Sequence, residues 1–207
     1  TIAYKINGKT TYAMEGSIFI AGAGVQWLRD KMKFFKKAPE TEKIVKSLKD
    51  NNNIYLVPAF TGLGAPYWDA NARGVLSGIT RDTSPKEIVR ATIEAVAYQT
   101  YDLFEAMKHD GLRPKIVKVD GGMVMNNWFS QFLSDIVNVK VLRPKVQETT
   151  ALGAAFMAGL QIGVYKSLKD ISKNWHLDKK FSPKMKNHLR NKLLKGWLAS
   201  IKKILTN

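Results

Sequence analysis

The sequence predicts an α/β layer structure. Three patterns indicate it: an amino-terminal hairpin, short apolar strands alternating with periodic helices, and glycines placed where a strand gives way to a helix. Alternating strands and helices pack as layers around one core, and 207 residues are enough for one sizeable core. The expected architecture is one α/β core followed by a helical carboxyl-terminal segment.

The amino-terminal part alternates between turn signals and apolar runs. Asn7-Gly8 suits the positive φ values of a type I′ turn, so residues 2–6 and 10–14 are expected to pair as a hairpin. The elements expected next are a tightly packed helix over residues 17–29, a helix near Glu40–Leu48 in a Lys-rich connection, a strand over Ile54–Pro58 and an aromatic-rich loop over 59–69.

The best-marked element is a strand followed by a helix. Residues 74–80 are an apolar run and predict the strand. Ser84, Pro85 and Glu87 then provide an N-cap, a proline at the first helical position and the acidic residue of a capping box. Helical spacing continues through Ile88, Ala91, Ala95, Gln99, Leu103 and Met107.

Glycines follow another apolar run. Lys115–Val119 predicts a strand that ends at Asp120-Gly121-Gly122, with a helix starting near Asn126. In α/β folds the carboxyl ends of strands open onto a crevice, and a helix beginning there directs free N–H groups at an anion. Gly122 would let a ligand approach the backbone, and Asn126 in the first helical turn could bond a ribose or a base edge. Taken alone, the pattern fits an ordinary tight turn better.

The remaining segments are a short strand and two helical regions. Val139–Leu142 is expected to be a strand stopped by Arg143-Pro144, and Thr149-Thr150 are expected to cap a helix that runs to Gly159. The last 30 residues predict a Lys-rich amphipathic helix whose apolar stripe is Leu189, Leu193, Leu194, Trp197, Ile201, Ile204 and Leu205.

The chain is strongly basic, with a net charge of +16 and 26 Lys against 7 Arg. Proteins that read nucleic acid favour Arg, whose fork grips phosphate or guanine with two hydrogen bonds. Here the lysines are scattered at helical spacing, which is typical of a solvated face with nonspecific affinity for polyanions. No specific nucleic-acid partner is expected.

Several classes of protein are disfavoured. No run approaches about 18 apolar residues and no signal peptide is recognisable, so no membrane segment is expected. The sequence contains no Cys, which fits a reducing, cytoplasmic location. His109, His176 and His188 lack metal-ligand spacing, and no metal site is predicted. The chain begins at Thr1 rather than Met, which predicts a removed segment or a longer parent sequence.

Six segments occur in a fixed order: Tyr12–Gly16 with Gly22 and Gln26–Asp30, Val57–Asp69, Gly74–Glu94, Ala97–Thr100, Val119–Gly122 with Asn126-Asn127, and Glu148–Ala155. Together they resemble the carboxyl-terminal portion of glycerol kinases, within the FGGY carbohydrate-kinase family. The resemblance covers residues 1 to about 165 and fades beyond Lys166. Met125 stands where the family usually has a smaller residue.

The resemblance implies an actin-like, ribonuclease-H-like fold. Residues 1–165 would be the second, carboxyl-terminal domain of a two-domain kinase, incomplete at its amino terminus. The resemblance also implies transfer of a phosphoryl group from ATP to glycerol with Mg²⁺, an amino-terminal half as partner and a homo-oligomeric full enzyme. The Lys-rich helical pattern beyond the resemblance predicts that residues 166–207 form an extension packed on this domain. The positions that match the family's nucleotide contacts are Gly22, Gln26, Gly122 and Asn126.

The family's catalytic base and most of its glycerol pocket correspond to sequence upstream of residue 1. The chain alone is therefore expected to be inactive, and no catalytic residue is assigned within it. Asp69 and Asp120 lack a partner that would tune a base, and structural roles are expected for both. The sequence leaves two alternatives open: a sibling FGGY kinase for another polyol or sugar, and a degenerate or split-gene remnant without catalysis, including a noncatalytic module that binds polyanions.

Overall fold

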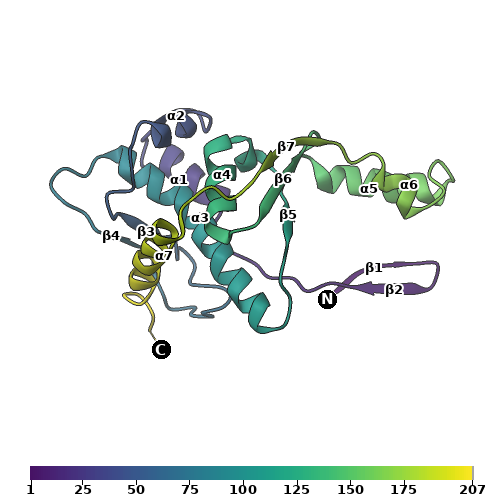
Figure 1. The fold of residues 1–207 in the computed structure, drawn as a ribbon, viewed down its shortest axis with the longest axis horizontal. Coiled ribbons are helices and arrows are strands. Elements are labelled where there is room, and N and C mark those ends of the chain that lie inside the picture. Colours follow the sequence, from purple (N-terminus) through teal and green to yellow (C-terminus); the bar gives the residue numbers. More distant parts are fainter. Residues whose placement is uncertain (207) are drawn as a thin grey trace.

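The computed structural model describes residues 1–206 and shows an α/β body with a projecting lobe (Figure 1). The elements of the first half are β1 (Ile2–Ile6), β2 (Lys9–Tyr12), α1 (Gly22–Asp30), α2 (Glu40–Lys46), β3 (Tyr55–Val57), β4 (Val75–Ser77) and α3 (Pro85–His109). Those of the second half are β5 (Ile116–Lys118), the 3-10 turn η1 (Gly122–Met125), α4 (Asn127–Val137), β6 (Lys140–Pro144), α5 (Thr149–Gln161), α6 (Leu168–Ser172), β7 (Leu177–Phe181) and α7 (Asn187–Ile201). The predicted mixture of strands and helices is confirmed.

The strands of the described residues form three small sheets. Strands β1 and β2 pair antiparallel, as do β3 and β4, and the third sheet has the order β5-β6-β7. In that sheet β5 runs parallel to β6, and β7 runs antiparallel to it. The predicted hairpin turn is confirmed, because Asn7 and Gly8 both have positive φ values, of 48° and 78°.

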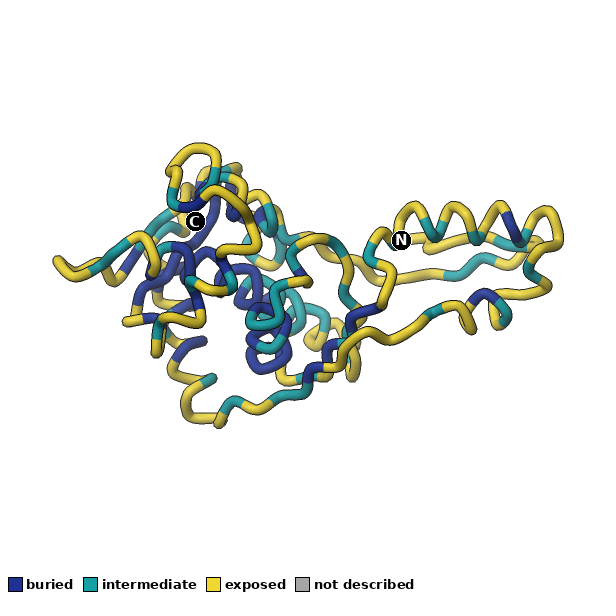
Figure 2. Tube along the Cα trace, turned by 90° about the horizontal axis from the view of Figure 1, so that it is seen from above, coloured by how far each residue is buried: buried dark blue, intermediate teal, exposed yellow. Residues whose placement is uncertain are grey.

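Helix α3 is the centre of the body. It contacts α1, α2, α4 and β3, and residues 89–98 along it are all buried. The predicted capping box is present: the Ser84 hydroxyl accepts from the Lys86 N–H, and the Glu87 carboxylate accepts from the Ser84 N–H. In Figure 2 the buried residues gather in this body, whereas the lobe formed by β1, β2, α5 and α6 is mostly exposed.

No helix within residues 1–206 combines the length and the apolar character needed to cross a membrane.

A glycine in the strand–turn segment before α3 has a steric cause. Gly78 directly follows β4 and has a φ of +83°, a region that other residues rarely adopt. A Cβ placed there would lie 2.1 Å from the carbonyl oxygen of Asn53. The glycine thus lets the chain pass directly over the turn that precedes β3.

The carboxyl-terminal segment differs from the prediction. A single helix over the last 30 residues is wrong, because residues 177–181 form the edge strand β7. Its sequence gives no strand pattern, since its first four residues are exposed and only Phe181 reaches the core. Helix α7 does pack on β3 and buries four residues of the predicted stripe: Leu193, Leu194, Trp197 and Ile201.

Two predicted boundaries are also wrong. Strand β6 continues through Arg143 and Pro144 instead of stopping before them; Pro144 is its last residue, where a missing amide donor costs little. Helix α5 has Glu148 in its N-cap position, and Thr149 and Thr150 are its first residues. The Thr149 hydroxyl instead donates to the Asp120 carboxylate, so it ties α5 to the end of β5.

A buried carboxyl joins α3 to α7 and to the aromatic loop. Asp102 Oδ2 accepts from the Trp197 indole N–H at 2.7 Å, and the Tyr67 hydroxyl is a second donor. Burial raises the pKa of Asp102 to about 6, although both hydrogen bonds oppose the rise. The native state therefore binds this proton more tightly than the unfolded chain, so the stabilisation is full below about pH 4 and is lost as the pH rises through 6.

Asp102→Asn is expected to raise the free energy of unfolding at pH 8 by about 1–3 kcal/mol. The neutral amide can still accept from Trp197 and carries no buried charge. Urea unfolding at pH 8 and pH 5 measures the effect, which should shrink at pH 5, and the exposed Asp110→Asn is the matched control. An equal change at both pH values would show that Asp102 is not the titrating group.

Candidate functional site

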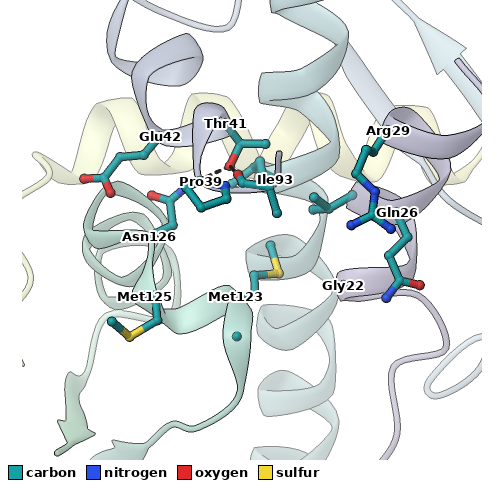
Figure 3. Close-up of a pocket in the computed structure, with 13 residues that line it drawn as sticks. Gly22, Gln26, Arg29, Pro39, Thr41, Glu42, Ile93, Met123, Met125 and Asn126 are labelled. Carbon is teal, nitrogen blue, oxygen red and sulfur yellow. Dashed lines mark hydrogen bonds between the residues drawn. The ribbon is translucent and has the colours of Figure 1, made fainter. Parts of the chain in front are cut away.

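A cavity of about 350 Å³ lies between α1, α2 and the start of α4 (Figure 3). All four predicted contact residues line it, although they come from segments about 100 residues apart: Gly22, Gln26, Gly122 and Asn126. Figure 3 shows Gly22 and Gln26 on one side and Asn126 on the other. The structure therefore brings the predicted residues together at one place.

Helix α1 forms the first wall. Gly22 begins this helix, and Gln26, one turn later, is exposed on the same face. Arg29 follows on the next turn and is held by Asp30 through two hydrogen bonds of 2.7 and 2.8 Å. Gly24 lets α1 pack closely on α3, because a Cβ there would lie 2.9 Å from the Thr92 methyl group. The wall therefore presents one amide and one guanidinium group to the cavity.

The second wall is built where β5 ends. Gly121, with a φ of 82°, turns the chain into η1, and Asn126 follows as the N-cap of α4. The predicted helix start near Asn126 is confirmed, but Asn126 is the N-cap, one residue before α4 begins at Asn127, and does not lie within the first helical turn. The Asn126 Oδ1 atom accepts from the Phe129 N–H at 2.9 Å. One of the free amides of α4 is thus already bound by a side chain.

A third wall was missed by the sequence prediction. Ala38 and Pro39, just before α2, and Thr41 and Glu42 within it line the cavity. The one pattern in this segment is the four-residue spacing of Thr41 and Val45, the two buried residues of α2, which is typical of one face of a helix. A threonine between two glutamates carries no recognisable ligand pattern, so this spacing predicts a helix but not a site.

Apolar side chains separate the polar walls. Ile93 of α3 and Met123 lie between Gln26 and Asn126 in Figure 3, and Met125 lies at the cavity edge, 48% exposed. An apolar slot flanked by a few amide and hydroxyl groups suits a flat heterocycle that carries polar edges. The polarizable methionine sulfurs also favour contact with an aromatic ring.

Asp69 and Asp120 both have hydrogen-bonding partners within the chain. The buried Asp69 accepts from the N–H groups of Asn71 and Ala72 and from Thr206, whose hydrogen bonds lower the pKa of Asp69 most. Asp120 is exposed and accepts from Thr149. Within residues 1–206, no group of three or more His, Asp or Glu side chains converges on a possible metal site.

Known proteins are similar to this chain in sequence and in fold. The profile of the C-terminal domain of the FGGY family of carbohydrate kinases matches residues 3–162. The chain belongs to this family. Glycerol kinase 1 of Pseudomonas aeruginosa is 54% identical over 204 residues, and the glycerol kinase of Clostridium botulinum is 52% identical over 206. Both alignments cover 99% of this FGGY chain and therefore continue beyond Lys166, whereas the family profile ends at residue 162, close to where the resemblance was expected to fade.

Solved structures of two kinases have a similar fold. The glycerol kinase of Plasmodium falciparum, crystallised with ADP, matches the whole chain with a TM-score of 0.89 and 37% identity. The gluconate kinase of Lactobacillus acidophilus matches 93% of it with a TM-score of 0.78 and 25% identity. The predicted actin-like α/β fold of the FGGY kinases is confirmed. The chain spans 41% of the two curated relatives and about the same share of both solved chains.

Proposed function

We propose that this FGGY chain provides the nucleotide-binding half of a glycerol kinase, which transfers the γ-phosphoryl group of ATP to glycerol. The observation that supports this most directly is the convergence of the four predicted contact residues on one cavity. Two further findings favour it: a relative crystallised with ADP shares the fold of the whole chain, and relatives with more than half of their aligned residues identical are glycerol kinases.

In this proposal the chain positions the nucleotide and does not perform the proton transfer. The cavity would hold the adenosine portion, with the ring in the apolar slot and its polar edges near Gln26 and Asn126. The catalytic base and most of the glycerol pocket would come from an amino-terminal half. The described acidic residues do not form a Mg²⁺ cage, so the nucleotide phosphates and carboxylates outside the chain would have to hold that ion.

The projecting lobe supports an amino-terminal partner. Helix α5 is largely apolar, yet only Gly159 along it is buried. Large apolar side chains of the hairpin and of the segments around β5 and α5 are also exposed: Ile2 61%, Tyr12 75%, Ile116 53%, Ile162 76% and Val164 64%. A helix that is apolar all round is normally covered by protein, and exposed apolar side chains of this kind are typical of an interface.

Calorimetric titration of the 207-residue chain with ADP tests the proposal. Gln26→Ala and Asn126→Ala are each expected to weaken ADP binding about 5- to 10-fold, the usual loss for one hydrogen-bonding group. Gln161→Ala removes another exposed helical glutamine, outside the cavity, and should leave the dissociation constant unchanged. Failure of the wild-type chain to bind ADP, or equal losses in all three variants, would contradict a nucleotide site here.

A further inference from the structure

Helix α2 is joined to the start of α4 at the cavity wall. Thr41, only 4% exposed, lies against Asn126. The neighbouring Glu42 carboxylate accepts hydrogen bonds from Asn127 and, at 2.5 Å, from Lys46. Both contacts to α4 cross from one helix to the other. Helix α2 is therefore fixed relative to the residue that caps α4.

The Thr41 hydroxyl is oriented so that it accepts from Asn126. Its own hydrogen is donated to the Ala38 carbonyl at 2.7 Å. Because a hydroxyl has only one hydrogen, the Thr41 oxygen faces Asn126 with a lone pair. The Asn126 Nδ2 atom donates to it at 3.4 Å. The nitrogen of the amide, and not its oxygen, is therefore the end that faces Thr41 (Figure 3).

The oxygen of the same amide is fixed by a separate bond. Asn126 Oδ1 accepts from the Phe129 N–H at 2.9 Å. The side-chain nitrogen carries two hydrogens, of which Thr41 uses one. The second remains available to an acceptor in the cavity that Asn126 lines. Two contacts from different helices thus determine how this amide meets a ligand.

We propose that Thr41 is a positioning residue for nucleotide binding: its hydroxyl holds the Asn126 amide with one N–H ready for an acceptor on the ribose or the base. This rests on the proposed function, since it requires the cavity to bind an adenine nucleotide. Without the hydroxyl, the cap bond to Phe129 persists and α4 keeps its start. The Asn126 nitrogen then loses its partner, and the amide samples orientations that bind the nucleotide less well.

The test compares Thr41→Val with Thr41→Ser in the 207-residue chain. Valine keeps the shape and removes the hydroxyl, whereas serine keeps the hydroxyl. In ADP titrations we expect Thr41→Val to raise the dissociation constant about 5- to 10-fold and Thr41→Ser to stay within about 2-fold of wild type. Ser47→Ala is the matched control, because the Ser47 hydroxyl of the same helical segment also donates to a local carbonyl, that of Ile44, but lies outside the cavity.

A second measurement detects the amide directly. The side-chain NH₂ signals of Asn126 in a ¹⁵N-correlated NMR spectrum are expected to shift in Thr41→Val and to stay in place in Ser47→Ala. If the wild type binds ADP and Thr41→Val has the same dissociation constant, the proposed role of Thr41 is overturned, whereas the proposed function is not. Equal losses in Thr41→Val and Ser47→Ala would also overturn it, because the effect would then belong to α2 as a whole. No ADP binding by the wild type would instead overturn the proposed function.

Discussion

The 207-residue chain alone is expected to phosphorylate glycerol no faster than buffer, and to gain at least about 10³-fold in rate when an amino-terminal kinase domain is supplied. Phosphoryl transfer requires a positioned hydroxyl, a group that accepts its proton and stabilisation of the phosphoryl charge. Only the nucleotide end of this arrangement has candidates among the described residues. Asp69, which follows the aromatic loop, and Asp120, which follows β5, are already engaged in structural hydrogen bonds.

The experiment co-expresses this chain with the part of Pseudomonas aeruginosa glycerol kinase 1 that precedes the matched region. ADP release is then followed with ATP, Mg²⁺ and glycerol. The two proteins are 54% identical over the matched region, so many interface residues are expected to be shared. The controls are each part alone and the pair carrying Gln26→Ala in this chain. Turnover by this chain alone would contradict the prediction.

The same assay separates the alternatives. An inactive pair that nevertheless assembles would favour a degenerate remnant. Strongly salt-dependent binding to a polyanion, with no effect of ADP, would favour a noncatalytic basic module.

Local rules predicted those parts of the fold in which a few adjacent residues determine the backbone. The Asn7-Gly8 turn and the Ser84–Glu87 capping box are examples, and both are present. Strand β7 could not be found in this way. Its residues face solvent on an edge, so the alternation that marks a half-buried strand is absent, and its pairing with β6 depends on residues more than 30 positions away.

The candidate site was predicted by resemblance more than by pattern. Spacing alone gave the Asp120-Gly122 turn only as a tight turn, and it placed Asn126 inside α4 instead of at its cap. The α2 wall was missed because Thr41 acts through Asn126, a contact between residues 85 positions apart. The local sequence does not indicate which helix will pack against the N-cap residue of another helix. The order of the segments that resemble the family, in contrast, indicated that Gly22 and Gln26 share a site with Gly122 and Asn126.

Two acidic residues of the segment Gly74–Glu94, Glu87 and Glu94, have structural roles. Glu87 belongs to the capping box of α3. Glu94 is fully buried and is paired with Arg90 at 2.8 Å, and the Tyr98 hydroxyl donates to its second oxygen at 3.0 Å. Arg90 also donates to the Leu48 carbonyl, just beyond α2. This network therefore holds α2 and α3 together next to Ile93 of the cavity.

Arg90→Leu is expected to reduce the free energy of unfolding by about 3–5 kcal/mol, because it leaves the Glu94 carboxylate buried without a cation and the Leu48 carbonyl without a donor. Lys108→Leu is the matched control on the same helix. Its partner Glu105 is half exposed, so breaking that pair should cost less than about 1 kcal/mol. Urea unfolding of the two variants measures the difference.

The pH dependence identifies the cause of this loss. Burial raises the pKa of Glu94, and the attraction of Arg90 opposes the rise, so Arg90→Leu should raise that pKa further. A folded-state pKa above the unfolded one gives stability that is full at low pH and lost as the pH rises through the folded value. The difference in the free energy of unfolding between wild type and Arg90→Leu should therefore be smaller at pH 5 than at pH 8.

Adding Glu94→Gln to Arg90→Leu should recover part of the lost stability at pH 8, because a neutral amide can still bind Tyr98. A double variant no more stable than Arg90→Leu at pH 8 would show that the loss comes from the Leu48 and Trp128 contacts of Arg90, and not from a stranded charge.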